Sequence, residues 1–133
     1  MKTLIGYLAV LVFSATIIMA FRPSPQQAKP WVVPDNFKAM KNPVKFDKTA
    51  AAALYSTHCK SCHGKEGLGD GTKAAQLDTK CGDFSSAAFQ KQSDGSLFYK
   101  TSEGRDDMPS FKKKIPDPND IWQLVHYMRT FAE

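Results

Sequence analysis

The sequence has few cysteines and lacks several patterns that identify common classes of protein. Its 133 residues include three cysteines, and a disulfide framework would need an even, dispersed set. No run of residues shows the alternation of a β-strand, and no internal repeat is visible. The glycine-rich stretch over residues 64–71 has neither a preceding strand nor a Gly-Lys-Ser/Thr ending. It is therefore not a phosphate-binding loop.

Arginine-rich runs and basic helices are also missing, although the formal net charge is +5 and the pI is about 9.1. Nucleic acid is therefore not expected as a partner. A basic balance of this kind suits acidic proteins or a membrane surface, or it reflects a solvated lysine-rich surface.

The N-terminal segment is apolar and nearly uncharged. Lys2 is followed by no charged residue until Arg22, and the stretch between them is about long enough to span a bilayer as a helix. We predict that residues 1–21 form an export signal or an uncleaved membrane anchor, so that the rest of the chain is exported. No cysteine follows the apolar run directly, which excludes a bacterial lipoprotein.

The remainder divides into a proline-rich segment and one small domain. Residues 22–46 contain five prolines and are predicted to form an extended arm or linker. Residues 47–133 are predicted to be all-α. We expect helices over residues 47–59, with Asp47 as N-cap, over 83–92, over 93–104, with Gly104 as the stop, and over 118–132, capped by Asn119 or Asp120. Apolar residues recur at helical spacing in the last of these, namely Ile121, Leu124, Val125 and Met128.

The sequence His58-Cys-Lys-Ser-Cys-His63-Gly carries the chemistry, and three interpretations compete. Cys59 and Cys62 lie one helical turn apart, so that each thiol can bond one porphyrin while His63 binds its iron. Alternatively, Cys59, Cys62, His63 or His58, and Cys81 could bind zinc, although a second closely spaced ligand pair is missing. A redox-active dithiol would instead require a βαβ pattern, which is absent.

A haem would also need a sixth iron ligand or an open site. Met108 lies on a proline-containing loop between the central helices and the last one. Its thioether would raise the reduction potential of the iron and suit it to electron transfer. Met40 and Met128 fit core packing better, and the position of His126 on a helix favours an ordinary surface histidine.

Taken together, "CKSCHG", "MPSF" and "IWQLVHYMRTF" occur in an order that resembles a class I c-type cytochrome over residues 49–131. The resemblance implies an all-α cytochrome c fold of short helices around one covalent haem c, with crossing N- and C-terminal helices. It implies thioether bonds from Cys59 and Cys62, with His63 as proximal ligand and Met108 as distal ligand. Leu54 and Tyr55 would lie against Trp122 and Tyr127 at the helix crossing. Ala51 stands where the family often has glycine, so the crossing is expected to be wider.

The segments "WVVPDNFKAMKNPV" and "SDGSLFY" are similar to bacterial mono-haem cytochromes that accompany respiratory complexes such as alternative complex III. The function implied is one-electron transfer by an exported or membrane-anchored, periplasmic component of a respiratory chain, rather than enzymatic catalysis. Its partners would be redox proteins or subunits of a respiratory complex. They would dock on a lysine-rich rim that we define as Lys60, Lys65, Lys112, Lys113 and Lys114. The alternative is a haem protein with an open iron site that binds peroxide or a diatomic gas.

Overall fold

The structure, a computed structural model, describes residues 29–132. The export signal or anchor predicted for residues 1–21 lies outside the described residues. The chain divides after Trp31 into two units, and every described helix lies in the second. None of the helices within residues 29–132 has both the length and the hydropathy needed to cross a membrane.

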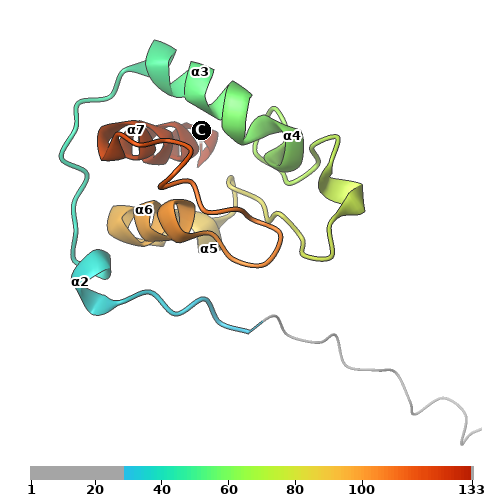
Figure 1. The fold of residues 1–133 in the computed structure, drawn as a ribbon, viewed down its shortest axis with the longest axis horizontal. Helices are drawn as coiled ribbons and strands as arrows, with labels where there is room; N and C mark the ends of the chain where they lie inside the picture. Colours follow the sequence, from blue (N-terminus) through green and yellow to red (C-terminus); the bar gives the residue numbers. More distant parts are fainter. Residues whose placement is uncertain (1–28, 133) are drawn as a thin grey trace, which may run out of the picture. The chain divides into compact units, whose positions relative to one another are not determined.

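The described residues are helical, as predicted, and contain no strand. The helices are α2 (Asp35–Lys38), α3 (Lys48–His58), α4 (Lys60–His63), α5 (Ala87–Gln90), α6 (Asp94–Glu103) and α7 (Pro118–Arg129), with short 3₁₀ turns at Ala74–Gln76 and Thr130–Ala132. Long loops connect them (Figure 1).

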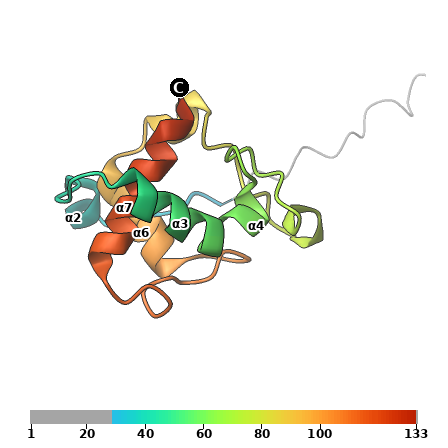
Figure 2. The ribbon, with the colours of Figure 1, turned by 90° about the horizontal axis from the view of Figure 1, so that it is seen from above.

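The crossing of α3 and α7 forms the centre of the domain, as Figures 1 and 2 show. Each helix starts at an aspartate whose side chain accepts backbone N–H groups of the first turn, Asp47 for α3 and Asp117 for α7. Such caps satisfy donors that a helix start leaves unpaired. The apolar face of α7 supplies the fully buried side chains of Ile121, Leu124 and Val125.

Helix α6 lies against α7 and contributes an aromatic contact. Ser93 caps α6, and its hydroxyl accepts from the N–H of Ser96. The Phe98 ring stacks on Trp122, with the ring centroids 4.2 Å apart. Tyr55 meets Tyr127 at 5.0 Å between centroids, in agreement with the predicted crossing, while Trp122 turns its ring toward α6.

Residues 32–46, here called the N-terminal arm, pack within the same unit as the domain. The arm contains α2, whose Phe37 ring lies 4.8 Å from that of Tyr99. Gly95 leaves room for this approach, because a side chain there would overlap the Phe37 carbonyl. The predicted boundary at residue 47 therefore does not coincide with a break in packing.

The arm is also hydrogen bonded along α7. Asn42 donates to the Trp122 carbonyl at 3.0 Å, and His126 donates from Nε2 to the Val44 carbonyl at 2.8 Å. Between them, Gln123 donates to the Lys45 carbonyl at 2.7 Å. The chain that leads into α3 is thus fixed against the last helix.

Candidate functional site

Two helical segments bring the cysteines and the histidine of the motif together. Helix α3 ends at His58, Cys59 forms the junction, and α4 contains Cys62 and His63. The N–H groups of Cys62 and His63 both donate to the Cys59 carbonyl, at 3.1 and 2.9 Å. The two thiols are therefore one turn apart, immediately before the histidine.

Burial keeps the first thiol protonated. It raises the pKa of Cys59 to about 12, with the neighbouring Cys62 as the second cause. Both cysteines are unpaired. No cluster of three or more metal-binding His, Cys, Asp or Glu side chains occurs within residues 29–132.

The imidazole of His63 is held neutral in an apolar setting. Burial lowers its pKa to about 4, although the backbone carbonyl of Cys81 acts in the opposite direction. Nδ1 is buried and finds no hydrogen-bond partner among the described residues. A neutral imidazole with unsatisfied bonding capacity, directly after two free thiols, fits a haem that is bound through both cysteines and ligated by this histidine.

The glycine-rich loop after the motif closes tightly over α4. The N–H groups of Gly69 and Gly71 donate to the carbonyls of His63 and Cys62, at 2.9 and 3.1 Å. A side chain at Gly71 would overlap the backbone of Ser61 and Cys62. Glycine is therefore needed at this position for the close approach that satisfies the end of the helix.

Met108 lies in a tight turn after α6. Arg105 and Met108 form an isolated antiparallel bridge, with N–H···O distances of 2.8 and 2.9 Å. Asp106, within the turn, has a φ of 53°, which is unusual for a residue other than glycine. Met108 packs half-buried against the hydrophobic core. Met108 therefore lies on a loop and packs against the core, while its role as a ligand stays a prediction.

A hydrogen bond connects the Met108 turn with the segment that approaches His63. The Asp107 carboxylate accepts from the N–H of Thr79 at 2.7 Å. Thr79 lies two residues before Cys81, whose carbonyl acts on the His63 ring. The Met108 turn is therefore bonded to the segment whose Cys81 carbonyl acts on the His63 ring.

The remaining histidines and the third cysteine take other roles. His58 meets the edge of the Phe111 ring at 6.0 Å, and His126 is hydrogen bonded to the arm. Cys81 is half-exposed, and the pKa of its thiol is raised by burial, then by Cys62 and Asp107. Like Cys59 and Cys62, it is unpaired.

Two residues near the site were not predicted, because they are distant from the motif in the sequence. Phe84 stacks on His63 with centroids 4.4 Å apart, and Asp107 joins the two loops. The sequence gives only a weak signal for Phe84, as one apolar residue at the start of the short helix predicted within residues 83–92. Nothing local indicates the bond from Asp107 to Thr79.

The site is that of a c-type cytochrome. The profile of the family described as "Cytochrome C oxidase, cbb3-type, subunit III" matches residues 46–128. The chain belongs to this family of cytochrome c domains. Its cofactor is accordingly covalent haem c, and it serves haem-based electron transfer.

Two solved structures are similar to the chain. One belongs to the Kuenenia stuttgartiensis reducing HAO-like protein complex Kustc0457/Kustc0458. It is 27% identical at a TM-score of 0.61, over 68% of this chain and 47% of that one. The other is the KustC0563 c-type cytochrome, 32% identical at a TM-score of 0.53, over 62% of this chain and 98% of that one. The chain therefore spans about half the length of the first. No curated protein matches the sequence significantly.

Proposed function

We propose that this protein is a one-electron carrier whose haem c is bonded to Cys59 and Cys62 and ligated by His63 and Met108. The observation that carries the proposal is the buried neutral imidazole of His63 beside two free thiols. Haem c supplies reversible one-electron chemistry when bound. It works as a carrier in a respiratory chain rather than as an enzyme.

The residues of this chain then have distinct roles. The two thiols fix the position of the cofactor relative to α4, and His63 offers a neutral nitrogen without first losing a proton. Met108 offers a thioether from a turn that is bonded at both ends, so that the ligand does not move with the redox state. The apolar core around them excludes water, which contributes to the potential.

The location proposed for the carrier is the periplasmic side of a bacterial cytoplasmic membrane. The apolar residues 1–21 support export, with the segment either removed or retained as an anchor. The proposed partners are other redox proteins or subunits of a respiratory complex. The lysine-rich rim supports docking to acidic partners, since Lys60, Lys65, Lys112, Lys113 and Lys114 are all exposed.

An optical spectrum of the matured protein and of Met108→Ala tests the ligand set. We expect a low-spin covalent haem spectrum with the far-red methionine–iron band, and loss of that band in the variant. The reduction potential should fall by a measurable part of the roughly 0.8 V range that axial ligands span. Met40→Ala is the matched control, because Met40 is exposed on the arm. Covalent haem without the band in the wild type would contradict Met108 as ligand and favour an open site for gas or peroxide.

A further inference from the structure

The Phe84 ring lies nearly parallel to the imidazole of His63. The centroids are 4.4 Å apart and the planes differ by 27°. Phe84 is 7% exposed, so the contact is shielded from water. Stacked aromatic rings resist rotation out of the shared orientation, because rotation loses contact area and favourable ring electrostatics.

Two contacts of the described residues can orient the His63 imidazole. A metal-bound histidine commonly donates its second ring N–H to a carboxylate, a carbonyl or water, and the backbone carbonyl of Cys81 acts on the His63 ring in this sense. The buried Nδ1 forms no hydrogen bond of ordinary geometry with any described residue, so this carbonyl alone does not fix the ring. The stacked ring of Phe84 is the second contact that can set the orientation of His63.

The backbone of Phe84 is itself fixed at both polar groups. Its N–H donates to the Gly67 carbonyl at 2.8 Å. Its carbonyl accepts from Nε2 of Gln90 at 2.7 Å. Gln90 donates from the same nitrogen to the Met128 carbonyl at 3.0 Å, which attaches this segment to α7.

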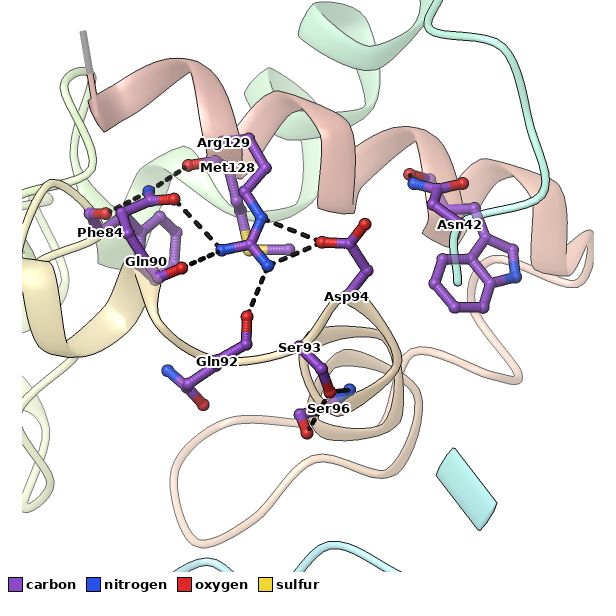
Figure 3. Close-up of polar contacts among 10 residues, drawn as sticks. Asn42, Phe84, Gln90, Gln92, Ser93, Asp94, Ser96, Met128 and Arg129 are labelled. Carbon is purple, nitrogen blue, oxygen red and sulfur yellow. Dashed lines mark hydrogen bonds and ion pairs between the residues drawn. The ribbon is translucent and has the colours of Figure 1, made fainter. Parts of the chain in front are cut away.

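Arg129 completes the attachment, as Figure 3 shows. Its guanidinium donates to the Gln90 carbonyl at 2.9 Å and to the Gln92 carbonyl at 2.6 Å. It also donates through two nitrogens to the Asp94 carboxylate, at 3.0 and 2.6 Å. A single side chain of α7 therefore holds the end of α5 and its connection to α6, and α5 directly follows the turn that contains Phe84.

We propose that Phe84 is a positioning residue that sets the rotation of the His63 imidazole, and that Gln90 and Arg129 hold Phe84 in place. The inference rests on the proposed role of His63 as proximal ligand. The plane of an axial imidazole determines the asymmetry of the ligand field at a low-spin ferric iron. Removal of the Phe84 ring should therefore change the electronic signature of the site without changing its ligands.

Electron paramagnetic resonance of the ferric holoprotein tests this with three variants. Phe84→Leu keeps an apolar side chain but removes the ring, and we expect it to shift the g values and to reorder the haem methyl shifts in the proton NMR spectrum. Phe84→Tyr keeps the ring and should restore the wild-type values. Phe89→Leu is the matched control, because Phe89 stacks on Phe84 at 4.5 Å, and no ring contact joins it to His63 within residues 29–132.

A measurement on the wild-type protein is independent of how well the variants mature. In the reduced protein, His63 ring protons bound beneath a haem are strongly shifted upfield, and they should show nuclear Overhauser effects to the Phe84 ring. A His63-ligated protein without these effects, or with g values unaltered in Phe84→Leu, would overturn this inference alone. A protein in which His63 does not ligate the iron would overturn the proposed ligand set as well.

Discussion

Tyr55 connects the first helix with the end of the haem-attachment motif. Its side chain is 2% exposed, and its hydroxyl donates to the Gly64 carbonyl at 2.8 Å. Burial, reinforced by nearby negative groups, raises the pKa of Tyr55 above its ordinary value. The phenol therefore stays protonated, and remains a donor, throughout the physiological pH range.

We predict that Tyr55→Phe destabilises the holoprotein by about 1–2 kcal/mol, since the substitution leaves the Gly64 carbonyl without its buried partner. Urea unfolding followed by circular dichroism measures the change. Tyr127→Phe is the matched control, because the Tyr127 ring lies on that of Tyr55 and its hydroxyl has no hydrogen bond within the described range. The free energy of unfolding of the control should stay within about 0.5 kcal/mol of the wild-type value. Equal losses in both variants would contradict this role of Tyr55.

At the level of single residues, the sequence predicted the residues whose chemistry depends on local spacing. Cys59, Cys62 and His63 follow from one short motif, and Met108 from its loop context; as ligands, all four remain predictions. Phe84 could not be found in this way, because its contact with His63 spans a loop of about twenty residues. A single apolar residue in a loop is far more often ordinary packing.

Among the elements, α3 and α6 were predictable because their N-caps are local, and α7 because its apolar spacing is local. The predicted cap of α7, Asn119 or Asp120, was wrong, because Asp117 caps the helix and Pro118 occupies its first turn. The short helix α2 was not predicted, since the surrounding prolines favour extended chain. Its Phe37 is positioned by contact with α6. The shape of the Met108 turn also escaped prediction, because Asp106 adopts a backbone conformation usually left to glycine.

The Met108 turn is expected to depend on the bond from Thr79 to Asp107. We predict that Asp107→Ala weakens the attachment by about 1 kcal/mol, so that the far-red methionine–iron band is lost at a lower urea concentration than in the wild type. Global unfolding should change less, because the bond lies at the surface.

Asp78→Ala provides the control for this prediction. The substitution removes one negative charge next to Thr79, as Asp107→Ala does on the other side of the hydrogen bond. The Asp78 side chain is exposed and has no hydrogen bond among the described residues. If both variants lose the band at the same urea concentration, the effect is one of charge and the proposed attachment is wrong.

For the whole molecule, the cofactor is expected to be part of the core. His63 and Cys59 are polar groups in apolar surroundings, and their burial is unfavourable unless they are bonded. We predict that the double variant Cys59→Ala/Cys62→Ala, which cannot attach haem, loses most of its free energy of unfolding. This free energy is roughly 5–15 kcal/mol for a typical domain.

Near-ultraviolet circular dichroism during urea unfolding measures this loss. Cys81→Ala is the control. It should keep a sharp unfolding transition, with a free energy of unfolding within about 1 kcal/mol of that of the wild type. A sharp transition in the double variant would show that the polypeptide folds without its cofactor.

The lysine-rich rim is a property of the whole surface. Lys112 is paired with Glu103 at 2.7 Å, whereas Lys113 and Lys114 are exposed beside the buried Phe111. We predict that Lys113→Glu/Lys114→Glu slows oxidation of the reduced protein by ferricyanide roughly threefold to tenfold at low ionic strength. The difference should shrink as salt is added.

Lys41→Glu/Lys45→Glu is the matched control, since it makes the same change of charge at exposed positions on the arm. Stopped-flow absorbance gives the rates. If both pairs of substitutions slow oxidation equally, net charge alone determines the rate and the lysine-rich rim has no specific role.

The attachment of the N-terminal arm has a mechanical consequence. A force applied to the arm at residue 32 would first load the contacts of Phe37 with α6. It would then load the hydrogen bonds that join Asn42 and the Val44 carbonyl to α7. Because these contacts lie in series along the arm, they would carry the force before it reached Asp47 and the helix that leads into the haem-attachment motif.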